Sequence, residues 1–202
     1  MMIVRQIAVG PMKNFDYLLM DDASKEAVAI DSGWETGSVV RAAHEDKMKV
    51  KYVIATHGHE DHVETLTELA EKLGAQTVAH ESSDLSTDIR VKDGDELKIG
   101  GASIRVIHTP GHTRDSICLF DGKDLFTGDT LFIGNCGRTD LPGGSTSELY
   151  HSLHSVLMAL PREAVIYSGH DYGEVRSRTM GEEMKTNPTL LARNLKEFMG
   201  VE

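Results

Sequence analysis

The first half of the chain alternates short apolar runs with turn-rich segments, which is typical of strands separated by tight connections. The run 51–55 (KYVIA) is almost continuously apolar and β-rich, so it predicts a strand buried on both faces. A helical pattern follows over 63–73 and is closed by Gly74, a residue type that often ends helices. Further elements expected in this half are a helix over 36–47 and strands over 3–9, 17–20 and 27–30.

The second half repeats this scheme of strands followed by helices. Strands are expected at 77–80, 103–108, 116–120, 124–126 and 164–167, and helices at 146–160, 176–185 and 190–199. Strands interleaved with helices in this way predict an α/β fold in which two sheets are sandwiched between helical layers. No linker composition or low-complexity segment interrupts the chain, so we expect a single domain over 1–202.

Composition and charge narrow the class of protein. With 40% hydrophobic and 26% charged residues, the 202-residue chain has the make-up of a globular protein with a sizeable core. No apolar run approaches the ~20 residues of a membrane-spanning helix, and residues 1–10 lack the apolar block of a signal peptide. The formal net charge of −11 argues against a nucleic-acid-binding face, which needs clustered Lys and Arg. We therefore expect a cytoplasmic protein with no nucleic-acid or membrane partner.

Cysteine is scarce and histidine is concentrated in one part of the chain. The two cysteines, Cys118 and Cys136, show no C-x-x-C spacing, which argues against a disulfide scaffold and against a thiolate zinc site. Nine of the ten histidines lie between His57 and His170, so their spacing becomes the informative feature.

The densest cluster of chemical groups is the segment 56–62 (THGHEDH), directly after a predicted buried strand. Three imidazoles and a carboxylate beside a core strand are hard to satisfy without a cation, because buried polar groups must be paired. His57 and His59 share one side of an extended backbone. Asp61 and His62 follow where the chain turns into a helix, so they can face a second point nearby. This arrangement predicts two adjacent metal sites rather than a solvated histidine-rich loop.

Three later segments each place one further candidate ligand at the C-terminal end of a predicted strand. They are 109–113 (TPGHT), 126–130 (FTGDT) and 167–171 (YSGHD), which carry His112, Asp129 and His170. Loops at strand ends gather functional groups on a rigid scaffold. A lone histidine in such a loop is more often structural, but the shared strand–glycine–ligand context favours convergence on one site.

These motifs resemble the metallo-β-lactamase superfamily in order and spacing over nearly the whole chain: an H-x-H-x-D-H run, a P-G-H-T turn, a T-G-D turn and a G-H-D segment. The resemblance implies an αβ/βα four-layer sandwich, in which two mixed β-sheets are flanked by helices and the metals lie at one edge. It also implies that one ion is held by His57, His59 and His112, that the other is held by Asp61, His62 and His170, and that both are bridged by Asp129.

The resemblance also implies a reaction class. Histidine and carboxylate ligands without thiolates suit zinc, iron or manganese. Two such divalent ions would lower the pKa of bound water to ~7 and supply hydroxide near neutral pH. They would also polarise a carbonyl and stabilise the oxyanion of a tetrahedral intermediate. Asp61 and Asp129 are therefore the candidate catalytic carboxylates of a metal-dependent hydrolase.

The stretch 126–138 (FTGDTLFIGNCGR) is similar to the glyoxalase II group, which hydrolyses thioesters of glutathione. A thioester suits the site because a thiol of pKa ~8.5 leaves without a strong general acid. Arg138 would orient the site or bind substrate carboxylates, and its alternative is a salt bridge with Asp140. Cys136 is either a pocket thiol or a small buried residue. We therefore favour a glyoxalase II-like thioesterase that acts on a small-molecule thioester.

A second resemblance supplies the alternative. The motifs that are closer to the persulfide dioxygenases, which oxidise glutathione persulfide at one iron, are 136–140 (CGRTD), 169–172 (GHDY), Glu182-Glu183 and Asn187-Pro188. This resemblance would place a single Fe(II) on His57, His112 and Asp129, a set that leaves open positions for oxygen. Tyr172 would then line the pocket of a thiol persulfide substrate. Lactonase or β-lactamase activity is a third option, and a non-catalytic metal-binding module is the alternative outside enzymes.

Several residues outside these motifs also need an interpretation. Asp31 begins a turn that lies near the metal edge in the superfamily, where it can orient a ligand histidine. His151 and His154 are three apart on one helical face, which we interpret as ordinary helix surface rather than a metal site. His80 and His108 lie on predicted strands and are expected to have core or supporting roles. An apolar edge or helix would be compatible with a homodimer.

Overall fold

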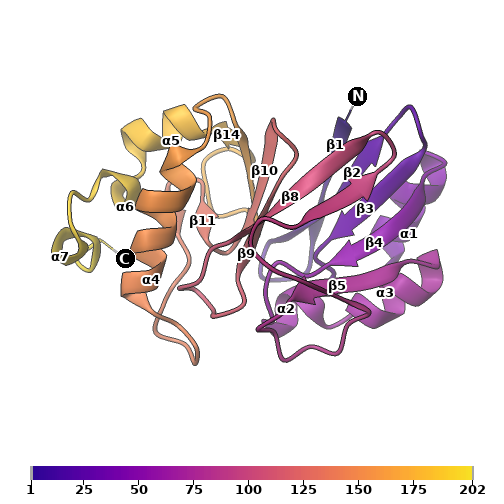
Figure 1. Ribbon diagram of the computed structural model, residues 1–202, viewed down its shortest axis with the longest axis horizontal. Coiled ribbons are helices and arrows are strands. Elements are labelled where there is room, and N and C mark those ends of the chain that lie inside the picture. The colour runs from indigo at the N-terminus through magenta and orange to yellow at the C-terminus, as the bar shows by residue number, and fades with distance from the viewer. Residues whose placement is uncertain (1, 202) are drawn as a thin grey trace.

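The computed structural model describes residues 2–201 and contains two large mixed sheets that lie face to face (Figure 1). The first sheet has the order β1 (Met2–Val9), β2 (Asn14–Asp21), β3 (Glu26–Ile30), β4 (Lys49–Ile54), β5 (Gln76–His80) and β6 (Ile89–Val91). Its first three strands pair antiparallel and its last four pair parallel, so β3 takes part in both patterns.

The second sheet has the order β14 (Arg178–Thr179), β13 (Val165–Ser168), β10 (Asp124–Gly128), β9 (Ile117–Phe120), β8 (Ala102–His108) and β7 (Glu96–Ile99). Only β10 and β13 pair parallel in this sheet. A separate two-stranded hairpin is formed by β11 (Leu131–Phe132) and β12 (Asn135–Cys136). We call residues 131–136 the β11–β12 hairpin.

Helices cover the outer faces of both sheets (Figure 1). The first sheet is covered by α1 (Gly37–Glu45) and α3 (Leu66–Leu73), with the short α2 (Glu60–Val63) between them in the chain. The second is covered by α4 (Thr146–His151), α5 (Met180–Thr186) and α6 (Pro188–Leu191), and α7 (Leu195–Phe198) packs against α4. The predicted αβ/βα four-layer sandwich is therefore confirmed.

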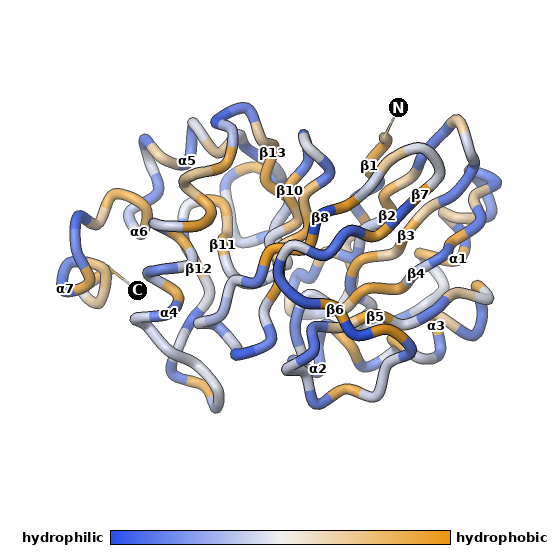
Figure 2. The backbone as a smooth tube through the Cα atoms, in the orientation of Figure 1, coloured by the Kyte–Doolittle hydropathy of each residue, from blue (hydrophilic) through white to orange (hydrophobic). Residues whose placement is uncertain are grey.

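Three apolar clusters fill the spaces between these layers. Strand β2 shows why, because it is buried along its whole length and its alternate side chains enter two different clusters. Phe15 and Tyr17 face the cluster between the sheets, where the Tyr17 ring lies edge-on to Phe126 at 5.2 Å. Leu18 and Met20 face the cluster under α1 and α3. Figure 2 shows that hydrophobic residues are concentrated in the central strands and hydrophilic residues in many of the outer turns.

The helix predicted over 146–160 is regular only in its first part. It is α-helical to His151, widens into a π-helical turn over Ser152–Val156, and ends as a 3-10 turn over Leu157–Ala159. Leu149, Leu153 and Leu157 are all fully buried along it, so packing against the sheet keeps one apolar face inward through these changes of helical type.

Two other predicted helices are shorter than expected because polar residues cap them. The helix over 176–185 begins only at Met180: Thr179 forms a capping box with Glu182, and residues 178–179 pair with β13 instead. The helix over 190–199 is two short helices, because Asn187 caps α6 and Asn194 caps α7. The predicted helix over 63–73 is similarly divided between α2 and α3, which ends at Gly74 as expected.

Five strands were not predicted: β6, β7, β11, β12 and β14, each two to four residues long. Segments this short carry no readable alternation of apolar and polar residues, and their strand geometry comes from the neighbouring strand with which they pair. Within residues 2–201, no helix has both the length and the apolar character that crossing a membrane requires.

Candidate metal centre

Four chain segments bring seven predicted ligands together at one edge of the sandwich. Each segment follows a strand: β4, β8, β10 or β13. Three overlapping groups have ligand atoms that all lie within 4.8 Å of one another, and they are His57/His59/His112, His57/His62/Asp129 and Asp61/His62/His170. All seven residues expected to hold metal are therefore placed in one cluster. His112 Nε2 also lies 3.7 Å from Asp129 Oδ2, so His57, His112 and Asp129 are close enough to share an ion.

The local backbone explains how segment 56–62 presents so many ligands. Strand β4 ends at Ile54, and the Thr56 amide then donates to Asp31 Oδ1 at 2.8 Å, which fixes the start of the loop. His59 is extended (φ −69°, ψ 141°) at the N-terminus of α2. Asp61 and His62 therefore lie in the first helical turn and face the second group of ligands, as the sequence predicted.

The ring nitrogens that point away from the centre are held by acceptors. Two acceptors are side chains: His57 Nδ1 lies 3.1 Å from Thr56 Oγ1, and His62 Nδ1 lies 2.9 Å from Asp31 Oδ2. Because Thr56 Oγ1 already donates to Asp31 Oδ2 at 2.9 Å, it accepts from His57. The interpretation of Asp31 as an orienting residue is thus confirmed.

The other two acceptors are main-chain carbonyls. His112 Nδ1 donates to the Arg138 carbonyl at 2.7 Å, and His170 Nδ1 donates to the Met12 carbonyl at 2.9 Å. A carbonyl can only accept, so the proton must be on Nδ1 in both rings. When these rings are neutral, their Nε2 lone pairs face the centre, which is the tautomer that binds a metal.

The inward-facing ring nitrogens cannot all be satisfied by one another, because neutral rings offer too few protons for these contacts. His59 Nδ1 lies 3.1 Å from His57 Nε2 and 2.9 Å from His112 Nε2. His62 Nε2 lies 3.2 Å from His170 Nε2. If His62 and His170 are both neutral, their Nε2 lone pairs face each other, and a proton on His59 Nδ1 could serve only one of its two neighbours. The buried Asp129 Oδ1 has no hydrogen-bond partner among the described residues. A cation removes both problems, so the residues present fit a bound metal ion.

The pKa values show the same demand for positive charge. Burial lowers the pKa of His62, but the negative charges of Asp129 and Asp31 outweigh burial and raise that pKa to about 10. Burial raises the pKa of Asp129, but the charge of His62 and the hydrogen bond from His170 outweigh it and hold that pKa well below the usual range. His57 has its pKa lowered, first by burial and then by His62. The field of the carboxylates therefore favours a cation at the centre.

Two residues outside the predicted ligand set, Asn14 and Trp34, complete the support of Asp61. Asn14 Nδ2 donates to Asp61 Oδ2 at 2.8 Å, and Trp34 Nε1 donates to Asn14 Oδ1 at 2.8 Å. Gly169 explains the glycine before His170, because a Cβ there would collide with the Asp129 carboxylate and lie 2.9 Å from His62 Cε1. A polar residue that begins a buried strand, as Asn14 does, is the signal that points to such a role.

A cleft of about 710 Å³ opens beside the ligands. Its remaining walls are mostly apolar, and they are formed by Met12, Phe132, Ile133, Gly134, Asn135, Cys136, Arg138, Leu141 and Tyr172. The three predicted substrate-binding residues, Cys136, Arg138 and Tyr172, are therefore all placed at the cleft. The Tyr172 ring is half exposed and stacks on His170 at 4.6 Å with an interplanar angle of 9°.

The structure also shows the surroundings of Arg138 and of the two cysteines. Arg138 Nε and Nη2 each lie 2.6 Å from a carboxylate oxygen of Asp140, so the salt-bridge alternative for this arginine is present. Cys136 is buried in the apolar cluster under α4 and also borders the cleft. Cys118 is fully buried, and burial raises the pKa of its thiol to about 11.

Other candidate groups lie outside the cluster. His151 is exposed, as expected for helix surface. His154 is instead partly buried: its ring stacks on Tyr150 at 4.2 Å, and its Nε2 donates to the Thr189 carbonyl at 3.0 Å. His80 and His108 stack on each other at 4.0 Å, which gives the strand histidines a partner.

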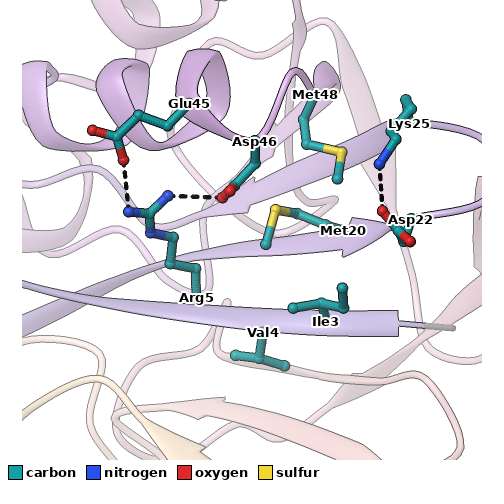
Figure 3. Close-up of a pocket in the computed structure, with 9 residues that line it drawn as sticks. All are labelled: Ile3, Val4, Arg5, Met20, Asp22, Lys25, Glu45, Asp46 and Met48. Carbon is teal, nitrogen blue, oxygen red and sulfur yellow. Dashed lines mark hydrogen bonds and ion pairs between the residues drawn. The ribbon is translucent and has the colours of Figure 1, made fainter.

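A separate hollow lies by β1 and the end of α1 (Figure 3). Its charged groups are paired with one another, because Arg5 binds both Glu45 and Asp46 at 2.7 Å and Lys25 binds Asp22. It therefore offers no free reactive group to a ligand.

Comparison with known proteins agrees with this geometry. The family described as "Metallo-beta-lactamase superfamily" matches residues 16–87 and 81–170. The human protein "Persulfide dioxygenase ETHE1, mitochondrial" is 35% identical over 204 residues, which cover 98% of this chain and 80% of the human protein. "Hydroxyacylglutathione hydrolase" of Pelagibacter ubique is 35% identical over 170 residues, which cover 82% of this chain and 70% of that protein. The crystal structure of ETHE1 from Myxococcus xanthus superposes with a TM-score of 0.93 at 35% identity, covering 99% of this chain and 89% of that one.

Proposed function

Because the chain belongs to the metallo-β-lactamase superfamily, we propose that it is a persulfide dioxygenase that uses one iron ion to oxidise a small thiol persulfide. The balanced reaction converts the persulfide, O2 and water into the free thiol and sulfite. Both named branches contain relatives at 35% identity, but the dioxygenase likeness covers 98% of this chain and the hydrolase likeness 82%. The relatives thus favour the persulfide dioxygenase, which was predicted from the sequence as the alternative, over the thioesterase, which was predicted as the first choice.

The observation that carries the proposal is the placement of His57, His112 and Asp129. Two histidines and one carboxylate on one side of an ion leave its other positions open to oxygen and to a sulfur ligand. When bound, iron(II) supplies the one-electron and O2 chemistry that amino-acid side chains lack. The chain's own residues orient the ligands: Thr56 and the Arg138 carbonyl hold the two rings with Nε2 inward.

The cleft suits a substrate of this kind. Phe132, Ile133 and Leu141 give the cleft an apolar wall, which would limit the access of water to the sulfur of a bound persulfide. Tyr172 lines the cleft and is half exposed, so its hydroxyl could hydrogen-bond to the thiol carrier of the substrate. Arg138 is exposed and can exchange Asp140 for a carboxylate of the substrate.

Oxygen uptake tests the proposal directly. Protein purified without added metal is analysed for iron, zinc and manganese, then mixed with glutathione persulfide in an oxygen electrode. We expect about one iron per chain and sulfite formed in equal amount to the O2 consumed. Absence of O2 uptake by the iron-loaded protein would reject the dioxygenase.

A second candidate, the metal-dependent thioesterase, is favoured by one specific observation. The group Asp61/His62/His170 forms a complete second set of ligands beside the first. Two divalent ions there would supply a metal-bound hydroxide for hydrolysis. Two zinc, iron or manganese ions per chain, together with turnover of S-lactoylglutathione, would favour this function over the first.

A further inference from the structure

One wall of the cleft, the β11–β12 hairpin, has little intrinsic rigidity. Its strands are two residues long and share only the pairs Leu131–Cys136 and Phe132–Asn135. A hairpin of this size is at most marginally stable by itself in water. Residues 132–136 nevertheless line the cleft continuously, so their position must be set by contacts from elsewhere.

Those contacts come from the end of α5. Glu183 is 0% exposed, and its Oε2 accepts hydrogen bonds from the Gly134 amide at 2.8 Å and from Asn187 Nδ2 at 2.9 Å. Asn187 Nδ2 also lies 3.1 Å from the Asn135 carbonyl and 3.3 Å from the Phe132 carbonyl. A buried carboxylate is costly unless it is hydrogen-bonded. The Glu183 carboxylate bonds to the hairpin backbone directly through the Gly134 amide and indirectly through Asn187, while its Oε1 lies 3.4 Å from Arg178 Nη1.

The hairpin in turn contacts the metal side of the cleft. The Phe132 ring meets His170 edge-on at 5.8 Å and Tyr172 edge-on at 5.5 Å. Gly173 allows this approach, because a Cβ at that position would lie 2.6 Å from Ile133 Cβ. A shift of the hairpin would therefore move the apolar wall and the Tyr172 ring without removing any ligand of the metal.

We propose that Glu183 and Asn187 are positioning residues that hold the β11–β12 hairpin in place and thereby set how tightly the cleft binds its substrate. This inference rests on the proposed function for its kinetic test. The two residues act through the hairpin backbone and touch neither the metal ligands nor the reacting sulfur. Their loss weakens substrate binding and leaves the metal site intact.

The test compares four variants of the full chain. Glu183→Leu removes the acceptor of the Gly134 amide, Glu183→Asp keeps the charge but shortens its reach, and Glu183→Gln keeps an oxygen acceptor. Glu182→Gln is the matched control, because Glu182 is exposed and its carboxylate caps α5 through Thr179 without touching the hairpin. For each variant we would measure iron content, kcat and KM with glutathione persulfide, and hydrogen–deuterium exchange over residues 131–136.

The expected result is a split between binding and turnover. Glu183→Leu should raise KM about tenfold and speed exchange of the Gly134 amide, with kcat and iron content close to the wild type. Glu183→Gln and Glu182→Gln should stay near wild-type KM. If Glu183→Leu does not fold, Glu183→Asp must show a raised KM and faster exchange of the Gly134 amide.

Two results would overturn the inference. The first is unchanged exchange over residues 131–136 in both Glu183→Leu and Glu183→Asp. The second is a fall in kcat and iron content that matches the rise in KM, which would indicate a general structural role. If the wild type consumes no O2, the proposed function fails. The role of Glu183 is then still decided by the exchange data, together with the affinity for glutathione measured by calorimetry in the wild type and the variants.

Discussion

The two halves of the metal centre hold their histidines in different ways. On the side of the first sheet, side chains orient the rings: Thr56 holds His57 and Asp31 holds His62. On the side of the second sheet, the Arg138 and Met12 carbonyls do the same work for their histidines. A side-chain acceptor can be removed by one substitution, whereas a carbonyl stays whatever the side chain becomes. The first half should therefore be much more sensitive to mutation of its supports than the second.

Asp129 belongs to both halves, and its loss should have the largest effect. Its oxygens lie 3.4 Å from His62 Nε2 and 3.3 Å from His170 Nε2. Asp129→Ala should remove bound iron and reduce sulfite formation to background, as measured by metal analysis and the oxygen electrode. Glu163→Ala, an exposed carboxylate on a loop before β13, is the control and should keep both. A fully active Asp129→Ala protein would contradict the assigned site.

Asp31→Asn tests the side-chain half against the carbonyl half. The amide loses the charge that holds His62 and Thr56, so metal affinity or activity should fall about 10–100-fold. Arg138→Ala is the matched change in the other half: it keeps the carbonyl that orients His112, so metal content should be unchanged. Chelator competition measures both affinities. Equal losses of metal affinity in the two variants would show that side-chain and carbonyl acceptors do not differ in how they affect metal binding.

Asp61→Asn distinguishes a site that holds one metal ion from a site that holds two. Asp61 belongs to the second group of ligands and not to the set of His57, His112 and Asp129. In a dioxygenase with one iron, the variant should keep about one iron per chain and lose only a few-fold in kcat. Metal analysis with kinetics checks this outcome. Loss of one of two ions together with all turnover would instead support the thioesterase.

Asp16 concerns stability rather than chemistry, and its effect should be the smallest on activity. Neither of its oxygens has a hydrogen-bond partner among the described residues. Burial, followed by the charge of Asp31, raises its pKa from 3.8 to about 8. Between these values the native state keeps a proton that the unfolded state releases, so this contribution to stability is present below pH ~4 and is lost as pH rises through about 8.

Asp16→Asn replaces the titrating carboxyl group in β2 with an amide that does not titrate. Relative to the variant, the free energy of unfolding of the wild type should fall by about 1.4 kcal/mol per pH unit over that window. Urea denaturation at several pH values from 4 to 8 gives the difference between the two proteins. A difference that does not change with pH would mean that Asp16 is already ionised in the folded protein.

Local sequence patterns predicted many of the helices and strands. A strand is present where 51–55 predicted one, although Lys51 and Tyr52 are half-buried rather than buried on both faces. The helix end at Gly74 and the strand–glycine–ligand segments are also present, because each depends on residues that are close together in the chain. The helices over 176–185 and 190–199 were predicted too long, because caps at Thr179 and Asn194 compete with helical composition. The β11–β12 hairpin was missed because two-residue strands leave no periodic signal.

The sequence by itself determined which residues would carry the chemistry, because histidines and aspartates in these short motifs are costly to keep beside core strands without a cation. Only the tertiary structure decided how those residues are oriented and what shapes the cleft. Asn14 supports Asp61 across 47 positions, and Glu183 reaches Gly134 across 49. Hydrogen bonds of this kind form between segments that the fold brings together, so they cannot be predicted from the neighbouring residues in the chain.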